Sequence, residues 1–410
     1  MNSKNLSLRS SITEARSFLK SLIILVSFII GLPLSAQIQI GADLDGQATG
    51  DFFGTSVSMP DAFTIAVGAS YADGALPSSG NVQVFTWNGS NWLKKGAPIG
   101  GESSGDLFGS AVSMPDADHL AVGAISNDGN GTDAGHVRVY TWNGSAWVQK
   151  GNDIDGETGL NQSGFSVSMP DPNTLAIGAN RNDGNGTDAG HVRVYTWNGS
   201  AWKQKGNDID GEAAGDQFGF SVSMADANTL AIGAKFNDGS GTDAGHVRVY
   251  GWNGSQWIQK GTDIDGEAAG NHSGVSVSMP DPNTLAVGAE LNSDGGYLSG
   301  HVRVYFWDGT QWIQKGNDID GAASGDQFGH SVSMADANTL VAGARLNDDN
   351  GTDAGHARAF IWDGSQWLQK GSDIDGEAAG DFSGSSISMP DPNVVAIGAV
   401  FNDGKLSNTG

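Results

Sequence analysis

The sequence predicts an all-β protein, a seven-bladed β-propeller of four-stranded blades with 55-residue repeats and an incomplete last blade. The Gly-Ala dipeptide begins at residues 68, 123, 178, 233, 288, 343 and 398, always at the same step. All twelve tryptophans follow this step, as six pairs that start at residues 87, 142, 197, 252, 307 and 362. Each repeat also holds four short segments with strand-like alternation. A solenoid is the alternative architecture.

The copy at residues 165–206 shows the expected elements of one repeat. Two apolar or alternating segments flank a tight Pro-Asp turn, and two more flank an Asn-Gly turn, with a long glycine-rich loop between the hairpins. The four expected strands are FSVSM (165–169), TLAIGA (174–179), HVRVYTW (191–197) and SAWKQKG (200–206), and the long loop is NRNDGNGTDAG (180–190).

The Asn198-Gly199 dipeptide predicts a two-residue type I′ turn, in which both central residues have positive φ. This turn places Trp197 opposite Ser200 and Tyr195 opposite Trp202, so that Tyr195, Trp197 and Trp202 share one face. The aromatic side chains then form either a packing cluster or a platform for stacking sugars. Recurrence at the outer edge of every unit favours packing.

The two ends of the chain predict how the ring closes. QIQIGADLDG (37–46) matches VQKGNDIDG (148–156), so an N-terminal strand at 37–46 is expected to close the last blade. The sequence ends at Gly410, just before a third strand of the last unit would begin. A truncated reading frame or a defective final blade would explain the missing strand. Truncation is favoured because the sheet edge is otherwise unpaired.

Residues 1–36 are predicted to be a signal peptide, which leaves 37–410 as the propeller. Lys4, Arg9, Arg16 and Lys20 surround or precede the apolar run at 22–32, and the small residues of LSA (34–36) suit cleavage before Gln37. The run is short for a membrane span, so an uncleaved anchor is the less favoured alternative. A secreted or cell-surface protein is expected, with no membrane insertion of the mature chain.

Composition excludes several classes of partner. The formal net charge is −25, which argues against nucleic acid and against docking on anionic lipid. The chain has no cysteine, so disulfides and lipid attachment through a thiol are excluded.

The repeats resemble the FG-GAP repeat of integrin α-subunit propellers and their bacterial secreted relatives. The resemblance rests on FGFSVSMADANTLAIGA (218–234) followed by GHVRVYGW (245–252), and it extends over 37–410. Phe-Gly begins at 53, 108, 218 and 328, whereas Ser-Gly begins at 163, 273 and 383, and the family's proline after Gly-Ala is missing at all seven positions. The resemblance implies a seven-bladed extracellular propeller used for binding or adhesion.

The family's calcium loops do not transfer to this chain. They lie between the first and second strands, where this sequence has only PDPN or ADAN, too few ligands for an ion that takes six to eight oxygens.

Two other acidic loops are candidates for calcium. The long loop and the DIDGE segment between repeats are expected on the same face of the ring, where crowded carboxylates could bind calcium as a possible cofactor. The alternative is that these residues only form turns. The candidate ligands are Asp153, Asp155, Glu157, Asp183, Asp188, Asp208, Asp210, Glu212, Asp238 and Asp243.

A periodic set of histidines begins the third strand of five repeats. Their side chains lie one per blade, too far apart to share one metal ion. A local hydrogen bond that closes the long loop is the favoured role. The set comprises His136, His191, His246, His301 and His356.

These observations favour a non-catalytic propeller that binds an extracellular protein or glycan through its loop faces. A structural repeat array within a larger surface protein is the alternative. An enzyme with a site in the central channel is less favoured, because an active site needs one unique constellation and the chain offers near-copies. The breaks in symmetry are His119, His272, His330, Tyr297 and the variant loops at 69–80 and 292–300.

Overall fold

A computed structural model describes residues 37–74 and 76–402 of the 410-residue chain. The predicted signal peptide at 1–36 lies outside the described residues. The part of the chain from Gln39 onward is one compact unit. The described residues form β-strands joined by turns, and none of them forms a helix long and apolar enough to cross a membrane.

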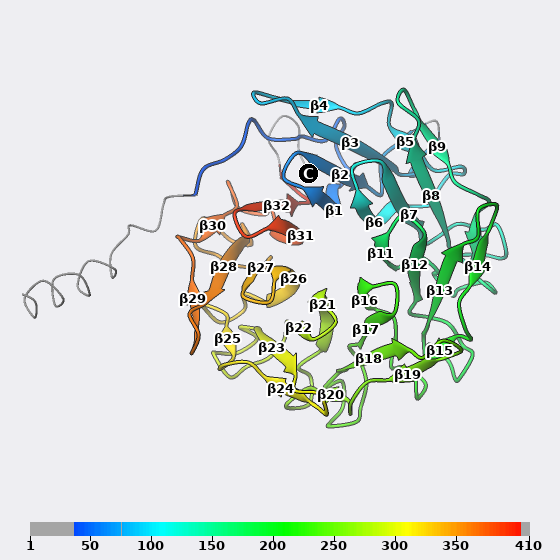
Figure 1. The fold of residues 1–410 in the computed structure, drawn as a ribbon. Helices are drawn as coiled ribbons and strands as arrows, with labels where there is room; N and C mark the ends of the chain where they lie inside the picture. The colour runs from blue at the N-terminus through cyan, green and yellow to red at the C-terminus, as the bar shows by residue number, and fades with distance from the viewer. Residues whose placement is uncertain (1–36, 75, 403–410) are drawn as a thin grey trace, which may run out of the picture. The chain divides into compact units, whose positions relative to one another are not determined.

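The third blade shows the structure of one repeat. Strands β11 (Ser166–Asp171), β12 (Thr174–Ala179), β13 (His191–Trp197) and β14 (Trp202–Gln204) pair in chain order, all antiparallel. A short fifth strand, β15 (Ile209–Asp210), pairs with the start of β13. The DID segment, expected to be a loop, is therefore part of the sheet. In Figure 1 the first strand of each blade lies near a common centre and the fourth lies at the outside.

The other blades repeat this order. The first strands are β1 (Phe53–Asp61), β6 (Phe108–Asp116), β16 (Ser221–Asp226), β21 (Ser273–Asp281), β26 (Phe328–Asp336) and β31 (Ser383–Asp391). The second strands are β2 (Thr64–Ala69), β7 (His119–Ala124), β17 (Thr229–Ala234), β22 (Thr284–Ala289), β27 (Thr339–Ala344) and β32 (Val394–Ala399). The third strands are β3 (Asn81–Trp87), β8 (His136–Trp142), β18 (His246–Trp252), β23 (His301–Trp307) and β28 (His356–Trp362).

The outer strands are shorter. The fourth strands are β4 (Trp92–Lys94), β9 (Trp147–Gln149), β19 (Trp257–Gln259), β24 (Trp312–Gln314) and β29 (Trp367–Gln369). The fifth strands are β5 (Ile99–Gly100), β10 (Ile154–Asp155), β20 (Ile264–Asp265), β25 (Ile319–Asp320) and β30 (Ile374–Asp375).

The number of blades corrects the prediction of a seven-bladed propeller with an incomplete last blade. The described residues form six blades, from the first (β1–β5) to the sixth (β26–β30), and not seven. The seventh repeat contributes only β31 and β32, a two-stranded sheet. Within residues 383–402, no third strand follows β32.

The inner strands nevertheless close a ring of seven. In each junction the backbone N–H of the strand's methionine donates to a serine hydroxyl of the preceding inner strand, at 2.8–3.0 Å. Met59 of β1 donates in this way to Ser388 of β31, which joins the last repeat to the first. Ser386 also donates to the carbonyl of Gly54. The two-stranded sheet therefore occupies a blade position in this ring.

Residues 37–46 do not form the strand expected there. The carbonyl of Ile40 accepts a hydrogen bond from Trp92 Nε1 at 2.9 Å, as the carbonyl of Lys150 does from Trp202 in the third blade. Leu44 and Val394 both pack against the core cluster that contains Phe53. The segment thus lies beside the first blade's tryptophan, but the seventh repeat offers no third strand with which it could pair.

The outer hairpin also differs from the prediction. Trp197 pairs with Trp202, and Tyr195 pairs with Gln204, so the loop has four residues and the type I′ turn is wrong. The side chain of Asn198 accepts hydrogen bonds from the backbone N–H groups of Ser200 and Ala201. Only Gly199 has positive φ in this loop. The side-chain bonds of Asn198 stabilise a wider loop than the Asn-Gly dipeptide alone suggests.

The recurring Gly-Ala dipeptide is explained by contact between neighbouring blades. A Cβ atom on Gly178 of β12 would lie 2.2 Å from the carbonyl oxygen of Gly219 in the next blade. Only glycine permits this approach. The second strands are otherwise buried Ala, Leu, Ile and Val, and each packs into a core cluster shared by adjacent blades.

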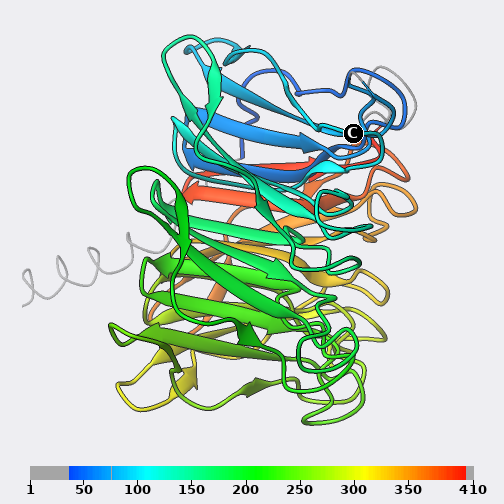
Figure 2. The same cartoon turned by 90° about the vertical axis from the view of Figure 1, so that its right-hand side faces the viewer.

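The two acidic segments of the repeat lie together, as expected. Asn185 of the long loop donates to the carbonyl of Gly211, directly after β15. Asn130 makes the same bond to Gly156 in the preceding blade. Figure 2 shows the loops gathered along one edge of the sheets.

Candidate functional site

The repeated histidine lies beside the DID segment because β15 and its copies pair with the third strand. His191 is opposite Asp210, and Val192 is opposite Ile209. Alternation in the short strand buries the isoleucine and leaves both aspartates on the other side, near the histidine. The preceding blade's connection supplies a glutamate, Glu157 in this case.

Five clusters of histidine and carboxylates result, one in each of the second to sixth blades. Within each cluster the ligand atoms lie within 4.8 Å of one another. We name each cluster by its histidine. The clusters are Glu102, His136 and Asp153; Glu157, His191 and Asp208; Glu212, His246 and Asp263; Glu267, Asp294, His301 and Asp318; and Asp349, His356, Asp373 and Asp375.

The histidines are buried and neutral at pH 7. Each is at most 1% exposed. Burial lowers the pKa of His191, His246 and His301 to about 4, and it lowers the pKa of His136 and His356 as well. Neutral imidazole is the form that binds metal ions.

The expected loop-closing hydrogen bond is absent at three of these histidines. Nδ1 of His246, His301 and His356 has no hydrogen-bond partner among the described residues. In the His356 cluster this nitrogen lies 3.7 Å from Asp373 and 3.9 Å from Asp375, beyond hydrogen-bonding distance. The prediction of a local bond that closes the loop is therefore wrong for these three side chains.

An arginine two residues after each histidine divides the clusters into two groups. In the second and fourth blades it pairs with the cluster carboxylates: Arg138 with Glu102 and Asp153, and Arg248 with Glu212 and Asp263. In the other three it donates to a backbone carbonyl of the preceding blade's fifth strand: Arg193 to Asp155, Arg303 to Asp265, and Arg358 to Asp320.

The electrostatics of the carboxylates follow this division. Hydrogen bonds from Arg248 lower the pKa of Asp263. In the sixth blade, burial and the charges of Asp373 and Asp349 raise the pKa of Asp375, against the opposing effect of His356. Arg248 therefore offsets the charge of Asp263 directly, whereas the pKa of Asp265 in the same blade is raised by burial and by Asp263.

The fifth and sixth blades have one carboxylate that the others lack. Asp294 and Asp349 stand where the third blade has Gly184. A Cβ atom on Gly184 would lie 3.7 Å from Asp210 Oδ1, so a side chain at this position points toward the DID segment. These two clusters therefore have four possible ligands instead of three.

The predicted calcium ligands separate into two sets. Asp153, Glu157, Asp208 and Glu212 belong to clusters, and Asp155 lies 4.0 Å from His136. The long-loop residues form turns instead. Asp183 accepts a hydrogen bond from the N–H of Asp188, which has positive φ, and Asp238 and Asp243 repeat this arrangement. Asp210 lies outside the His191 cluster.

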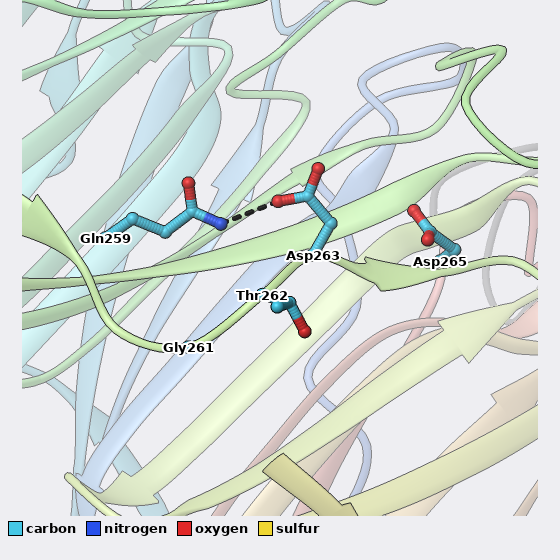
Figure 3. A pocket seen from close by; sticks show the side chains of 5 residues that line it. All are labelled: Gln259, Gly261, Thr262, Asp263 and Asp265. Carbon is cyan, nitrogen blue, oxygen red and sulfur yellow. Dashed lines mark hydrogen bonds between the residues drawn. The ribbon is translucent and has the colours of Figure 1, made fainter. Parts of the chain in front are cut away.

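A shallow hollow adjoins the acidic segment of the fourth blade. Its volume is about 480 Å³, and Gln259, Gly261, Thr262, Asp263 and Asp265 line it. Figure 3 shows Gln259 turned toward Asp263, to which its Nε2 donates a hydrogen bond of 2.6 Å. A second hollow of about 460 Å³ lies at the equivalent residues of the third blade, including Asp208 and Asp210.

Sequence reasoning missed the combination of histidine with carboxylates. It considered the histidines and the acidic segments separately, because the DID segment was expected to be a loop. The signal was present, since histidine, DID and the preceding glutamate all recur at the same step. The pairing of the fifth strand with the third is what brings them together.

The tryptophan pairs are packing elements at blade junctions. Trp197 and Trp202 contact each other with ring centroids 5.5 Å apart, and Lys150 of the preceding blade lies 5.4 Å from both rings. Lys150 also donates to the carbonyl of Pro172 and to Asn173. Since these contacts recur at the blade junctions, they support the packing interpretation over a sugar platform.

Two of the non-repeated histidines meet at one buried carboxylate. Glu290, which directly follows β22, accepts a hydrogen bond of 2.7 Å from His330 Nδ1, and His272 lies 3.7 Å away. Arg345 is 3.9 Å from the same carboxylate. Burial opposes the ionisation of Glu290, but the hydrogen bond from His330 and the nearby His272 and Lys235 outweigh it and lower the pKa.

The inner ring of strands and the radial four-stranded sheets define the chain as a β-propeller. Segments 42–85, 100–140, 209–250 and 319–360 match the model of the FG-GAP repeat. The chain is therefore a β-propeller that carries FG-GAP repeats, which confirms the resemblance seen in the sequence. A comparison with curated proteins finds no match.

Solved structures support the fold. One similar chain is a Bacteroides uniformis protein whose crystal structure bears the name of a 6-phosphogluconolactonase, with a TM-score of 0.51 and 8% sequence identity. The match covers 84% of this chain and 88% of that chain. At this identity the similarity shows a shared fold and carries no argument about activity.

Proposed function

We propose that this protein is a secreted or cell-surface binding module, without catalytic activity, that engages an extracellular protein or glycan through its acidic loop face. In this proposal, divalent cations, including calcium, bind to the acidic loop face and stabilise it. FG-GAP repeats in a β-propeller fit a binding or structural role. The predicted signal peptide supports export.

The observation that carries the proposal is the repeated display of carboxylates along one side of the blades. Asp210, Asp265 and Asp320 end equivalent fifth strands and are all exposed. Burial and neighbouring carboxylates raise the pKa of each. A surface with this much like charge attracts basic groups or cations.

The non-repeated residues do not favour the enzyme alternative. Glu290 contacts His330 and Arg345, and the hollows of the third and fourth blades are lined by other residues. An ion-pair network of this kind also perturbs pKa values where no reaction occurs.

Binding to arrays of immobilised polysaccharides and purified extracellular matrix proteins tests the proposal. The secreted protein is compared with a triple variant, Asp210→Asn, Asp265→Asn and Asp320→Asn. We expect at least one array component to bind the parent protein and to lose about tenfold in affinity with the variant, since tenfold corresponds to about 1.4 kcal/mol.

A matched control carries the same charge change on the opposite loops. Asp171→Asn, Asp226→Asn and Asp281→Asn lie in the turns between first and second strands, where each aspartate accepts one local backbone bond. Equal losses in the two triple variants would contradict a role of the acidic face. Binding to no array component would contradict the binding function and favour the structural array.

A further inference from the structure

The His301 and His356 clusters have the composition of metal sites. We propose that the fifth and sixth blades each bind one divalent transition-metal ion of the zinc class, through His301, Glu267, Asp294 and Asp318 and through His356, Asp349, Asp373 and Asp375. The role of these ions in stabilising the binding face rests on the proposed function. The binding of the ions themselves does not depend on any partner.

The histidine nitrogen is the first reason. His356 is completely buried, and its Nδ1 has no hydrogen-bond partner among the described residues. A buried polar atom without a partner is costly unless another ligand satisfies it. This nitrogen lies 4.0 Å from Asp349 Oδ2 and 3.7 Å from Asp373 Oδ2, so carboxylate oxygens surround the space in front of it. The same holds for His301, whose Nδ1 lies 3.8 Å from Glu267 and 3.7 Å from Asp318.

The charge of the two clusters is the second reason. Three carboxylates and one imidazole lie together in each cluster. No arginine or lysine forms a described ion pair with Asp349, Asp373 or Asp375, because Arg358 donates to the carbonyl of Asp320 instead. In the His301 cluster Arg303 reaches only Glu267, at 3.5 Å. The charge of Arg358 acts on Asp373 and Asp349 without a direct ion pair, and the carboxylates remain in excess, so a dication would compensate the remaining negative charge.

The ligand set selects the class of ion. Calcium takes six to eight oxygens, whereas zinc takes about four ligands and accepts imidazole nitrogen with carboxylate oxygen. Tetrahedral bonds of about 2.0–2.2 Å separate neighbouring ligands by about 3.4 Å. The carboxylates must therefore move toward the imidazole by about half an ångström. The Asp349 side chain is 60% exposed and has room for this movement.

The second and fourth blades provide an internal contrast. The His136 and His246 clusters lack the fourth ligand, and Arg138 and Arg248 already pair with their carboxylates. The His191 cluster also has three possible ligands, and Arg193 lies 3.9 Å from Glu157. We therefore expect no tight binding in these three blades.

The test uses the full secreted chain without a polyhistidine tag. After treatment with chelator and dialysis, zinc is titrated by calorimetry, and cobalt is titrated by visible absorbance, which reports four-coordinate geometry. We expect two equivalents of zinc to bind, the absorption of tetrahedral cobalt, and a melting temperature that rises with zinc. Magnesium at the same ionic strength should not reproduce the rise.

Single substitutions assign the sites. His301→Asn and His356→Asn copy the asparagine of the first blade and should each remove one equivalent, whereas the matched His191→Asn should leave two. Asp294→Gly and Asp349→Gly copy the third blade at exposed positions, so they test the same sites if a histidine variant fails to fold. We expect each to weaken one equivalent at least tenfold.

Three results would overturn the inference. They are the absence of zinc binding in the micromolar range, a stoichiometry that the His301 and His356 substitutions leave unchanged, and an equal loss with His191→Asn. If the protein binds an array component but no zinc, this inference is overturned and the proposed function stands. If it binds zinc but no array component, this inference stands and the proposed binding function is overturned.

Discussion

The first and sixth blades share one framework and differ at the edge where their long loops begin. Both have a buried phenylalanine at the start of the inner strand, Phe53 or Phe328, and a tryptophan pair at the outer edge. The sixth blade adds the His356 cluster. The first blade has other residues at each equivalent position, Gly74 for Asp349, Asn81 for His356, Pro98 for Asp373 and Gly100 for Asp375.

This difference shows where the repeat tolerates change. The buried phenylalanine and the tryptophan pair are the same in both blades, because they pack in the common framework. Positions at the start of β3 or β28 and in β5 or β30 face the loops, where the backbone pairing is the same with or without carboxylates. The framework therefore holds the site residues in place without depending on them.

The largest expected effect tests the common framework. Phe53→Ala and Phe328→Ala should each lower the free energy of unfolding by about 3–5 kcal/mol, because each removes a buried ring from a close-packed core. Urea unfolding followed by tryptophan fluorescence measures both. A difference of more than about 2 kcal/mol between the two variants would show that the blades do not share one framework.

A second prediction concerns the inner edge of the sixth blade, where His330 bonds Glu290 of the fifth. In the first blade Thr55 stands in the place of His330 and contacts Ser70 of its own blade. Glu290→Gln should cost about 2 kcal/mol at pH 7, because it removes the hydrogen bond between His330 and a charged group. Ser70→Ala is the matched control and should cost about 1 kcal/mol or less.

The pH dependence follows from the lowered pKa of Glu290. A carboxyl group whose pKa is lower in the folded state stabilises the protein above its unfolded pKa of about 4.3, and this contribution is lost as the pH falls below that value. The stability difference between the parent protein and Glu290→Gln should therefore shrink between pH 7 and pH 3. A difference that stays constant would show that Glu290 has the same pKa in the folded and unfolded protein.

A third prediction makes the junction of the sixth blade resemble that of the first. Lys315 lies 5.2 Å from both Trp362 and Trp367, whereas the first blade has Ile40 at the equivalent position. Lys315→Ile should cost about 1 kcal/mol, because a cation–π contact and hydrogen bonds to Ala337 and Asn338 are lost. The exposed Lys94→Ile should stay within about 0.5 kcal/mol in the same thermal unfolding measurement. Equal effects would assign no role to the lysine at the junction.

The smallest effect on stability is expected from a graft into the first blade. Gly74→Asp, Asn81→His, Pro98→Asp and Gly100→Asp together reproduce the His356 cluster, and a Cβ atom on Gly100 meets nothing closer than 4.0 Å. Calorimetric titration should show one further zinc equivalent, with unfolding in chelator changed by about 1 kcal/mol or less. If the number of zinc ions bound per chain does not change, the identity of the four ligand residues alone is not sufficient to form a zinc site.

Particular elements show what the sequence could predict. The step of Gly-Ala and Trp predicts the repeat and its four main strands, since contacts between blades impose the same residues each time. The turn at Asn198 was predicted wrongly, because its side chain bonds to the backbone and stabilises a four-residue loop. The count of seven blades was predicted wrongly, because the seventh Gly-Ala belongs to an inner hairpin that forms only a two-stranded sheet among the described residues.

The candidate site could be predicted only in part. Its carboxylates were recognised from their spacing, but their contact with histidine depends on β15 pairing with β13. A pattern of two residues is too short to predict a strand. The orientation of Arg248 toward Asp263, and of Arg358 away from Asp373, also has no counterpart in the sequence, where both repeats contain the same arginine.

The circle of serine-to-methionine hydrogen bonds has a mechanical consequence. A linear chain usually has a first and a last element that can fray independently, but the bond from Met59 to Ser388 leaves the inner strands without an end. The inner strands then form a closed ring, in which a force that pulls one strand outward is distributed over the hydrogen bonds of all the others. Loosening one sector must break the bonds on both of its sides, so the inner strands resist local opening even where a sheet is only two strands wide.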